Sequence, residues 1–368
     1  GSTWTEVADL AAVRIIPARG VMGAGSTYAL VTGGTPPPSG LTSTEEWALA
    51  SPISVAQEGQ VWYNTTSTVL KGYKLTFGTG AWASKNTCNT ARYYLSGCGI
   101  TTASLIMGGT ILPYPSVNNS SEEYDGTSWA EGNNLLTARI AAAGLGTQTA
   151  GLAVGGNANP PISADVEAYD GTCWTEGNNL NTARDFISGA GTSTAGLAMG
   201  GGGPTTNKQT ELWNGTSWTE VNDRNSTASY GAGAGTSTAG LVSGGSSPPG
   251  ETYRGFTETY DGSSWTEVAD LNTARSIPGG FGIQTHAIVF GGQNASPGYV
   301  GVTESFDGTS WTEVADLATA RRGSASGTIG TSTAGLCGAG LIATPALSNL
   351  TEEWTLPAPI EIKTFTSS

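Results

Sequence analysis

The feature that most constrains this chain is an internal repeat of about 45 residues. Each unit contains an arginine, an apolar segment ending in Gly-Gly, an aromatic residue followed by Asp-Gly or Asn-Gly, and a tryptophan. The tryptophans that mark the units are Trp82, Trp129, Trp174, Trp218, Trp265 and Trp311, spaced 44–47 residues apart. Because units of 20–50 residues pack mainly on their neighbours, all 368 residues can form one domain.

Each unit predicts four antiparallel strands. In the unit that ends at Trp311, we expect strands at 277–282, 287–290, 304–306 and 311–314. Asp-Gly between the last two strands predicts a two-residue type I′ turn, which needs positive φ at both central positions. The Gly-Gly pair predicts either positive φ or a close approach of neighbouring backbone.

Seven units are expected, and the chain ends suggest how they close. The second glycines lie at 34, 109, 156, 201, 245 and 292, and Gly338-Ala-Gly340 is a degenerate seventh member. Residues 4–10 repeat residues 311–317, which include the fourth strand of their unit, whereas the last unit lacks a fourth strand. We therefore expect the N-terminal strand, within residues 1–10, to complete the last blade and leave no open edge.

The repeat resembles the kelch repeat, which has a diglycine after an apolar strand and then a spaced tyrosine and tryptophan. This resemblance implies an all-β, seven-bladed kelch-type β-propeller with four-stranded antiparallel blades. The propeller would span residues 1–368 as a single domain. Unit one is longer than the others, which predicts an inserted hairpin at about 50–80 in the first blade, and residues 358–368 form a short C-terminal tail. Propellers of the WD40 type carry a Gly-His pair in each repeat, and this chain has the single histidine His286.

The charge excludes several classes of partner. The net charge of −14 argues against binding to nucleic acid, and no apolar run is long enough for insertion into a membrane. The oligomeric state stays open, as does the question whether the N-terminus is native or trimmed.

Most of the repeated side chains are expected to stabilise the fold. The arginines occupy one repeat position, where Ser229 is the exception, and are expected to bind backbone carbonyls or a neighbouring acid. They are Arg14, Arg92, Arg139, Arg184, Arg275 and Arg321. The tryptophans are expected to pack between blades. The four cysteines replace small or apolar residues, which favours unpaired thiols, and the disulfide state of Cys88 and Cys98 stays open.

No catalytic residue is expected, so the chain is interpreted as not an enzyme. A lone histidine cannot build a two-histidine metal site, so neither a metal nor a cofactor is expected. A glycoside hydrolase that uses paired carboxylates remains a less favoured alternative. Its candidates are the doublets Glu45-Glu46, Glu122-Glu123 and Glu352-Glu353, although their recurrence at one repeat position favours a structural role.

Recognition is expected on the loops between the second and third strands. These loops vary in length and share one face with the turns between blades, and such loops on a rigid framework are where binding is usually built. Tyr114, Tyr253, Phe256 and Tyr299 are the candidate ligand-binding residues, suited to stacking on a sugar or contacting a protein. In the inserted hairpin, Trp62, Tyr63 and Tyr73 are candidates for docking to a partner.

Residues 59–71, with Gly-Gln-Val-Trp-Tyr-Asn-Thr-Thr followed by Leu-Lys, look like a hairpin of structural proteins in marine tailed phages. The Glu-Glu-Trp-x-Leu-x-x-Pro-Ile pattern at 45–53 and 352–360 is similar to segments of the same proteins. The resemblance implies a structural and recognition protein of a tail, fibre or decorating appendage, located in a virion or outside the cell. Its partners would be other virion proteins or a host-surface glycan or protein. A secreted or cell-surface carbohydrate-binding propeller is the alternative.

Overall fold

The computed structural model divides into two compact units, one of residues 79–357 and one of residues 1–78 with 358–368. In the first unit it describes residues 80–356, with gaps at 115, 159–160, 204–207, 228, 248–251, 296–297, 327–331 and 344–345. In the second unit it describes the backbone of five strands.

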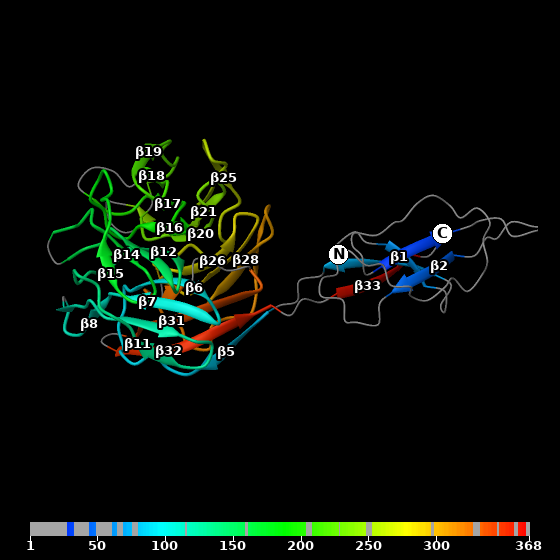
Figure 1. Ribbon diagram of the computed structural model, residues 1–368, viewed down its shortest axis with the longest axis horizontal. Helices are drawn as coiled ribbons and strands as arrows, with labels where there is room; N and C mark the ends of the chain where they lie inside the picture. Colours follow the sequence, from blue (N-terminus) through cyan, green and yellow to red (C-terminus); the bar gives the residue numbers. More distant parts are fainter. Residues whose placement is uncertain are drawn as a thin grey trace, which may run out of the picture. The chain divides into compact units, whose positions relative to one another are not determined.

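The larger unit is a β-propeller of six four-stranded antiparallel blades (Figure 1). Blade 1 contains β6 (Ser96–Ile100), β7 (Ala103–Met107), β10 (Ser121–Tyr124) and β11 (Trp129–Glu131). Blade 2 contains β12 (Ala143–Thr147), β13 (Ala150–Val154), β14 (Val166–Tyr169) and β15 (Trp174–Glu176). Blade 3 contains β16 (Ser188–Gly191), β17 (Gly196–Met199), β18 (Thr210–Trp213) and β19 (Trp218–Val221).

The remaining blades follow the same order. Blade 4 contains β20 (Ala232–Gly235), β21 (Gly240–Ser243), β24 (Thr257–Tyr260) and β25 (Trp265–Val268). Blade 5 contains β26 (Gly279–Ile283), β27 (His286–Phe290), β28 (Thr303–Phe306) and β29 (Trp311–Glu313). Blade 6 contains β30 (Ala325–Ser326), β31 (Ala334–Ala343), β32 (Ala346–Thr355) and β5 (Ala81–Lys85). Two ribbons, β8 (Thr110–Ile111) with β9 (Ser116–Val117) and β22 (Ser246–Ser247) with β23 (Thr252–Tyr253), extend the loops of blades 1 and 4.

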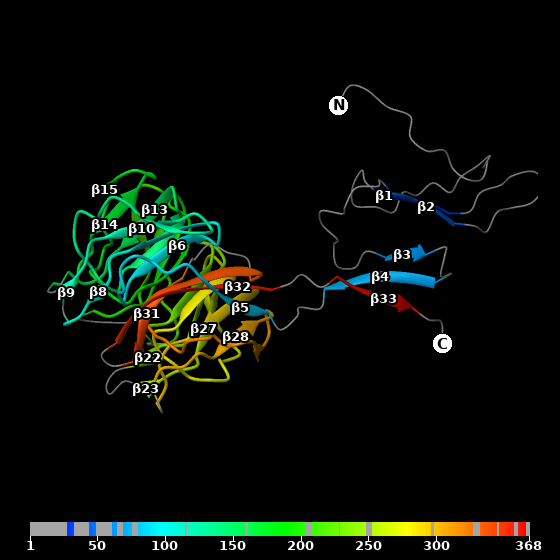
Figure 2. The same ribbon diagram turned by 90° about the horizontal axis from the view of Figure 1, so that it is seen from below.

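The predicted count of seven blades is wrong, because the strand of Trp82 does not complete the first repeat. β5 pairs with β32 of the last repeat, with Trp82 opposite Trp354, and the two strands lie side by side in Figures 1 and 2. The edge of β32 that was expected to receive residues 1–10 is therefore occupied by β5. Residues 1–10 lie outside the described residues, so closure by that segment is not confirmed.

The hydrophobic core is divided into layers between adjacent blades. One layer packs Cys98 and Leu105 of blade 1 against Tyr169 and Trp174 of blade 2, and equivalent clusters fill the other junctions. Trp129, Trp174, Trp218, Trp265 and Trp311 are each 4–7% exposed. The prediction that the tryptophans pack between blades is confirmed.

Glycines let the innermost strands approach one another closely. A Cβ on Gly144 of β12 would lie 2.3 Å from the carbonyl oxygen of Gly97 on β6. A Cβ on Gly233 of β20 would lie 2.4 Å from that of Gly189 on β16. No other residue fits between such backbones, so the inner strands are rich in glycine.

Buried arginine–glutamate pairs fasten each crossover segment to the blade that it enters. Arg184, just before blade 3, binds Glu211 on β18, with 2.8 Å between Nη2 and Oε1, and donates to the carbonyls of Gly200 and Gln209. Glu211 also accepts the backbone N–H of Asn181. The other pairs are Arg92–Glu122, Arg139–Glu167, Arg224–Glu258, Arg275–Glu304 and Arg321–Glu352. The expected bonds to carbonyls and a neighbouring acid are confirmed for the arginines that the structure describes, whereas Arg14 lies outside the described residues.

One blade obtains its guanidinium from a different position. In the segment before blade 4, Arg224 stands where Leu271 stands before blade 5, and its Nη2 lies 3.4 Å from Oε1 of Glu258. Ser229 forms an isolated antiparallel β-bridge with Ser246, and Ser276 forms the equivalent β-bridge with Gln293. Ser229 therefore corresponds to Ser276 in the repeat. The residue that replaces the repeated arginine is therefore Ala228. The prediction that Ser229 takes this place is wrong by one position.

The hairpin between the third and fourth strands also differs from the predicted two-residue turn. Tyr260 pairs with Trp265, which leaves a four-residue loop, and of Asp261 and Gly262 only the glycine has positive φ. The Asp261 carboxylate replaces the missing backbone bonds by accepting the N–H groups of Ser263 and Ser264. This is an Asx turn, in which the aspartate side chain mimics a backbone turn.

The second unit contains two small sheets. β1 (Tyr28–Thr32) pairs with β2 (Thr44–Ala48). β3 (Val61–Asn64) and β4 (Val69–Leu75) pair as an antiparallel hairpin, and β33 (Ile360–Phe365) pairs with β4. The hairpin thus belongs to this sheet and not to a blade.

Candidate ligand-binding site

One face of the propeller carries a series of backbone hydrogen bonds between the turns that enter neighbouring blades. Ala141 donates its N–H to the carbonyl of Tyr94 at 2.8 Å, and Phe186 donates to Ala141 at 2.7 Å. Ile277 donates to Tyr230, Gly323 to Ile277 and Tyr94 to Gly323. We call these six residues the axial ring.

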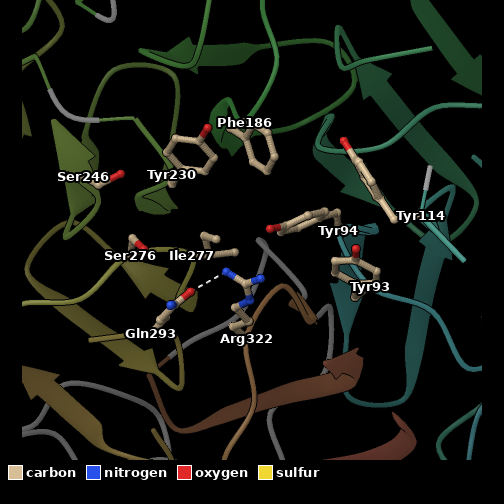
Figure 3. A pocket seen from close by; sticks show the side chains of 10 residues that line it. All are labelled: Tyr93, Tyr94, Tyr114, Phe186, Tyr230, Ser246, Ser276, Ile277, Gln293 and Arg322. Carbon is tan, nitrogen blue, oxygen red and sulfur yellow. Dashed lines mark hydrogen bonds between the residues drawn. The ribbon is translucent and has the colours of Figure 1, made fainter. Parts of the chain in front are cut away.

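The axial ring forces its residues into an unusual backbone conformation. Tyr94, Ala141, Phe186, Tyr230 and Ile277 have φ between 49° and 64°, in the left-handed region that favours glycine, and the sixth member is Gly323 at 60°. Side chains held there cost of order 1–3 kcal/mol each, and such strain is concentrated at functional sites. Figure 3 shows the side chains of Tyr94, Phe186, Tyr230 and Ile277 around one shared space.

Aromatic rings from different blades meet in that space. The centroid of Tyr94 lies 5.1 Å from that of Phe186, which lies 4.1 Å from that of Tyr230. Tyr93 adds a ring 4.4 Å from Tyr94. Burial raises the pKa of Tyr94 to about 12, although the nearby Arg322 guanidinium lowers it, so its hydroxyl is neutral at physiological pH.

A single cation faces these rings. The guanidinium carbon of Arg322 lies 5.8 Å from the Tyr94 ring centroid and 5.0 Å from that of Tyr299. One guanidinium N–H of Arg322 donates to the side-chain oxygen of Gln293, as the dashed line in Figure 3 marks. Arg322 directly follows Arg321 of the buried pair, so its place is fixed by that pair.

These groups enclose a cavity of about 280 Å³, which we call the axial pocket (Figure 3). Its lining residues are Tyr93, Tyr94, Tyr114, Phe186, Tyr230, Ser246, Ser276, Ile277, Gln293 and Arg322. Arg322 is the only one of them with a formal charge. Rings with a few convergent polar groups are typical of a small-molecule site.

The predicted ligand-binding residues are brought together only in part. Tyr114 lines the axial pocket and is 56% exposed, and Tyr299 lies beside the pocket against Arg322. Tyr253 lies on β23 opposite Ser246, while Phe256 packs under Arg254, whose guanidinium carbon lies 5.4 Å from the ring centroid. Neither Tyr253 nor Phe256 lines the pocket.

The predicted docking residues lie on the smaller unit. Trp62 and Tyr63 are on β3 opposite Lys71 and Leu70, and Tyr73 is on β4 opposite Ile362. Their side chains are outside the described residues.

Tyr94, Phe186, Tyr230 and Arg322 were not predicted, although the repeat contains a signal for them. The first two stand two residues after a repeated arginine, where the sequence changes from Tyr94 to Ala141, Phe186, Ile277 and Gly323 while the arginine is kept. The arginine position is the same in these units because it is structural, whereas the position two residues later varies, as expected for residues that bind a ligand.

The acidic doublets take structural roles where they are described. Glu122 and Glu352 are buried against arginines, Glu123 accepts the hydroxyl of Tyr169, and Glu353 binds Lys85 at 2.7 Å. Burial raises the pKa of Glu122, although Arg92 and two backbone N–H groups lower it. None of these carboxylates lines the axial pocket, and Glu45 and Glu46 lie on β2 with side chains that are not described.

The cysteines are unpaired in the structure. The thiol of Cys88 donates to the carbonyl of Asn349 at 3.2 Å, and that of Cys98 to Thr147 at 3.5 Å. Burial raises the pKa of each thiol to about 12.

In the part of the chain that the structure describes, no three His, Cys, Asp or Glu side chains come together as metal ligands. Nor do the described residues include a helix with the length and apolar character needed to cross a membrane. No family model matches the chain, and no curated protein matches it significantly.

Proposed function

We propose that this chain is a non-enzymatic recognition protein that binds a host-surface glycan in the axial pocket. One observation carries the proposal: turns from different blades hold Tyr94, Phe186 and Tyr230 around one cavity together with polar groups. Aromatic rings with polar edges suit the mixed apolar and hydroxylated surface of a sugar. The hydrogen-bonded ring beneath them is rigid, which lowers the entropy lost on binding.

We further infer that the blades are of the kelch type and that the protein is part of a tailed-phage particle, in a tail, fibre or appendage. The diglycine after the second strand in blades 1–5 supports the kelch assignment, and the hairpin of residues 59–71 supports the phage assignment. A carbohydrate-binding propeller that is secreted or on a cell surface uses the same pocket, so the two alternatives differ only in location. Detection of the protein in purified virions supports the phage assignment, and its absence from purified virions contradicts that assignment.

A glycan array tests the binding function directly. We expect the wild-type protein to bind a defined set of glycans, and Phe186→Ala to weaken that binding at least ten-fold, since a lost stacking contact of about 1–1.5 kcal/mol adds to the lost contact area. Tyr253→Ala is the matched control, because Tyr253 is an aromatic residue on the same loop face but outside the pocket. Equal binding by both variants contradicts the proposal.

A further inference from the structure

The axial pocket contains a cation that the fold does not require. At the repeat position of Arg322 the other turns carry Tyr93, Ile140, Asp185, Ser229 and Ser276. Four different residue types, none of them basic, occupy these five positions without loss of the turn. Arg322 is therefore a local departure from the repeat, and its charge needs another explanation.

The other buried arginines of the propeller are paired with acidic residues. Six of them each bind a glutamate on the blade that they enter, because a charge removed from water is stable only when paired. Arg322 is half-buried, and it is absent from the ion pairs formed among the described residues. Its contacts are the neutral side chain of Gln293 and the rings of Tyr94 and Tyr299.

We propose that Arg322 binds the carboxylate of an acidic sugar, such as a uronic or sialic acid, whose ring stacks in the axial pocket. This inference rests on the proposed function and names its ligand class. A guanidinium presents five N–H donors in a planar fork that matches a carboxylate, and Gln293 uses one of them. Gln293 and the Tyr94 and Tyr299 rings hold the fork in place before the ligand arrives.

The pocket favours a sugar over an acidic peptide. A volume of about 280 Å³ lies near the lower end of the range for ligand sites, roughly 300–1,000 Å³, and suits one ring with its substituents. Rings meeting from different blades make a compact cup, whereas an extended peptide is bound along a sheet edge or groove. The hydroxyls of Ser246 and Ser276 line the same cavity and can bind sugar hydroxyls.

The test uses the full chain and a panel of glycans containing glucuronic, galacturonic or sialic acid, each paired with its methyl ester. We expect at least one acid to bind and its methyl ester, which has lost the negative charge and gained a methyl group, to bind ten-fold or more weakly. Arg322→Gln should reduce binding of that acid to the level of the ester, and Arg322→Lys should recover part of it. Arg254→Gln is the control, because Arg254 packs on Phe256 outside the pocket and should leave binding unchanged.

The outcomes separate the inference from the function on which it rests. Equal binding of acids and esters, or of neutral glycans alone, overturns the role of Arg322 while the proposed function holds. Failure of every glycan, neutral or acidic, overturns both. Arg322-dependent binding of a glutamate-rich peptide without any glycan overturns the sugar assignment. A thermal melt of Arg322→Gln that matches wild type shows that lost binding is not lost folding.

Discussion

At the scale of single residues, each blade has a guanidinium paired with the glutamate on its third strand, and the arginine that supplies it can come from either of two sequence positions. Arg224 reaches Glu258 from the position that Leu271 occupies in the next unit, so the ion pair is kept while its origin in the chain moves. A sequence alignment detects the residue type at a position and misses such an exchange. Only the structure shows that the guanidinium of Arg224 lies close enough to Glu258 to form the ion pair.

Breaking this pair should be costly. Arg224→Leu leaves Glu258 buried without its cation, so we expect the free energy of unfolding to fall by about 3–5 kcal/mol. The double variant Arg224→Leu with Ala228→Arg restores the pattern of Leu271 and Arg275 and should recover most of that loss. Urea unfolding measures both, and a double variant no more stable than Arg224→Leu contradicts the exchange.

The pocket shows the same limit at residue scale. Tyr114 was predictable because an aromatic residue in a variable loop is conspicuous, whereas Tyr94 and Phe186 read as ordinary apolar residues ahead of a strand. Their positive φ turns them to the axis, and no sequence pattern of non-glycine residues announces that conformation.

At the scale of elements, the hairpins at the outer edge are organised by a charged side chain. Hydrogen bonds from the backbone and side chains of Ser263 and Ser264 lower the pKa of Asp261 from 3.8 to about 2, and bonds from Thr309 and Ser310 lower that of Asp307 to about 2. Asn214 makes the same backbone bonds without a charge in blade 3. The sequence predicted a turn here, while its type depended on where the carboxylate points.

These turns predict a dependence of stability on acid. A carboxyl group with a lowered pKa in the folded state stabilises the fold above its unfolded pKa, so this contribution is complete above about pH 4 and is lost as the pH falls through about 2. The double variant Asp261→Asn with Asp307→Asn should show a smaller loss between pH 5 and pH 2 in urea unfolding. A carbon-13 titration of wild type that places Asp261 near its ordinary 3.8 contradicts the mechanism.

The contact between inner strands makes a second prediction at this scale. Gly144→Ala places a methyl group 2.3 Å from the backbone of Gly97 on the neighbouring blade, so unfolding should become easier by about 1–3 kcal/mol or more. Gly177→Ala is the matched control, because its nearest atom would lie 3.4 Å away, an ordinary contact. Chemical denaturation of the two variants measures the difference, and equal stability argues against close packing of the inner strands.

At the scale of the whole molecule, the repeat predicted the four-stranded blades, their packing and the shared loop face, but not their number. Residues 44–47 and 351–354 have the same sequence, Thr-Glu-Glu-Trp, so the sequence contains two equivalent candidate partners for the strand of Trp82, and in the structure that strand pairs with β32. The local sequence pattern cannot predict which of two identical segments pairs with the strand of Trp82. The choice is made by ring closure, which depends on contacts between residues far apart in the chain.

Closure by β5 predicts where truncation is harmful. Removing residues 79–85 strips the strand that covers β32 and removes Trp82, whose Nε1 donates to Thr303 at 3.0 Å and whose ring packs on Phe290 and Trp354. We expect this deletion to lower the melting temperature strongly, while deletion of residues 1–10 leaves the propeller transition unchanged. Calorimetry that gives the reverse order places the closing strand at the N-terminus.

The pairing of β5 with β32 also sets how the ring is connected to the rest of the polypeptide. Ala81 lies opposite Thr355, so the chain enters and leaves through two points about 5 Å apart. The propeller, residues 79–357, is therefore one insert between the two segments of the smaller unit. A recombination event that swaps this insert can exchange one specificity for another and leave the surrounding protein as it was.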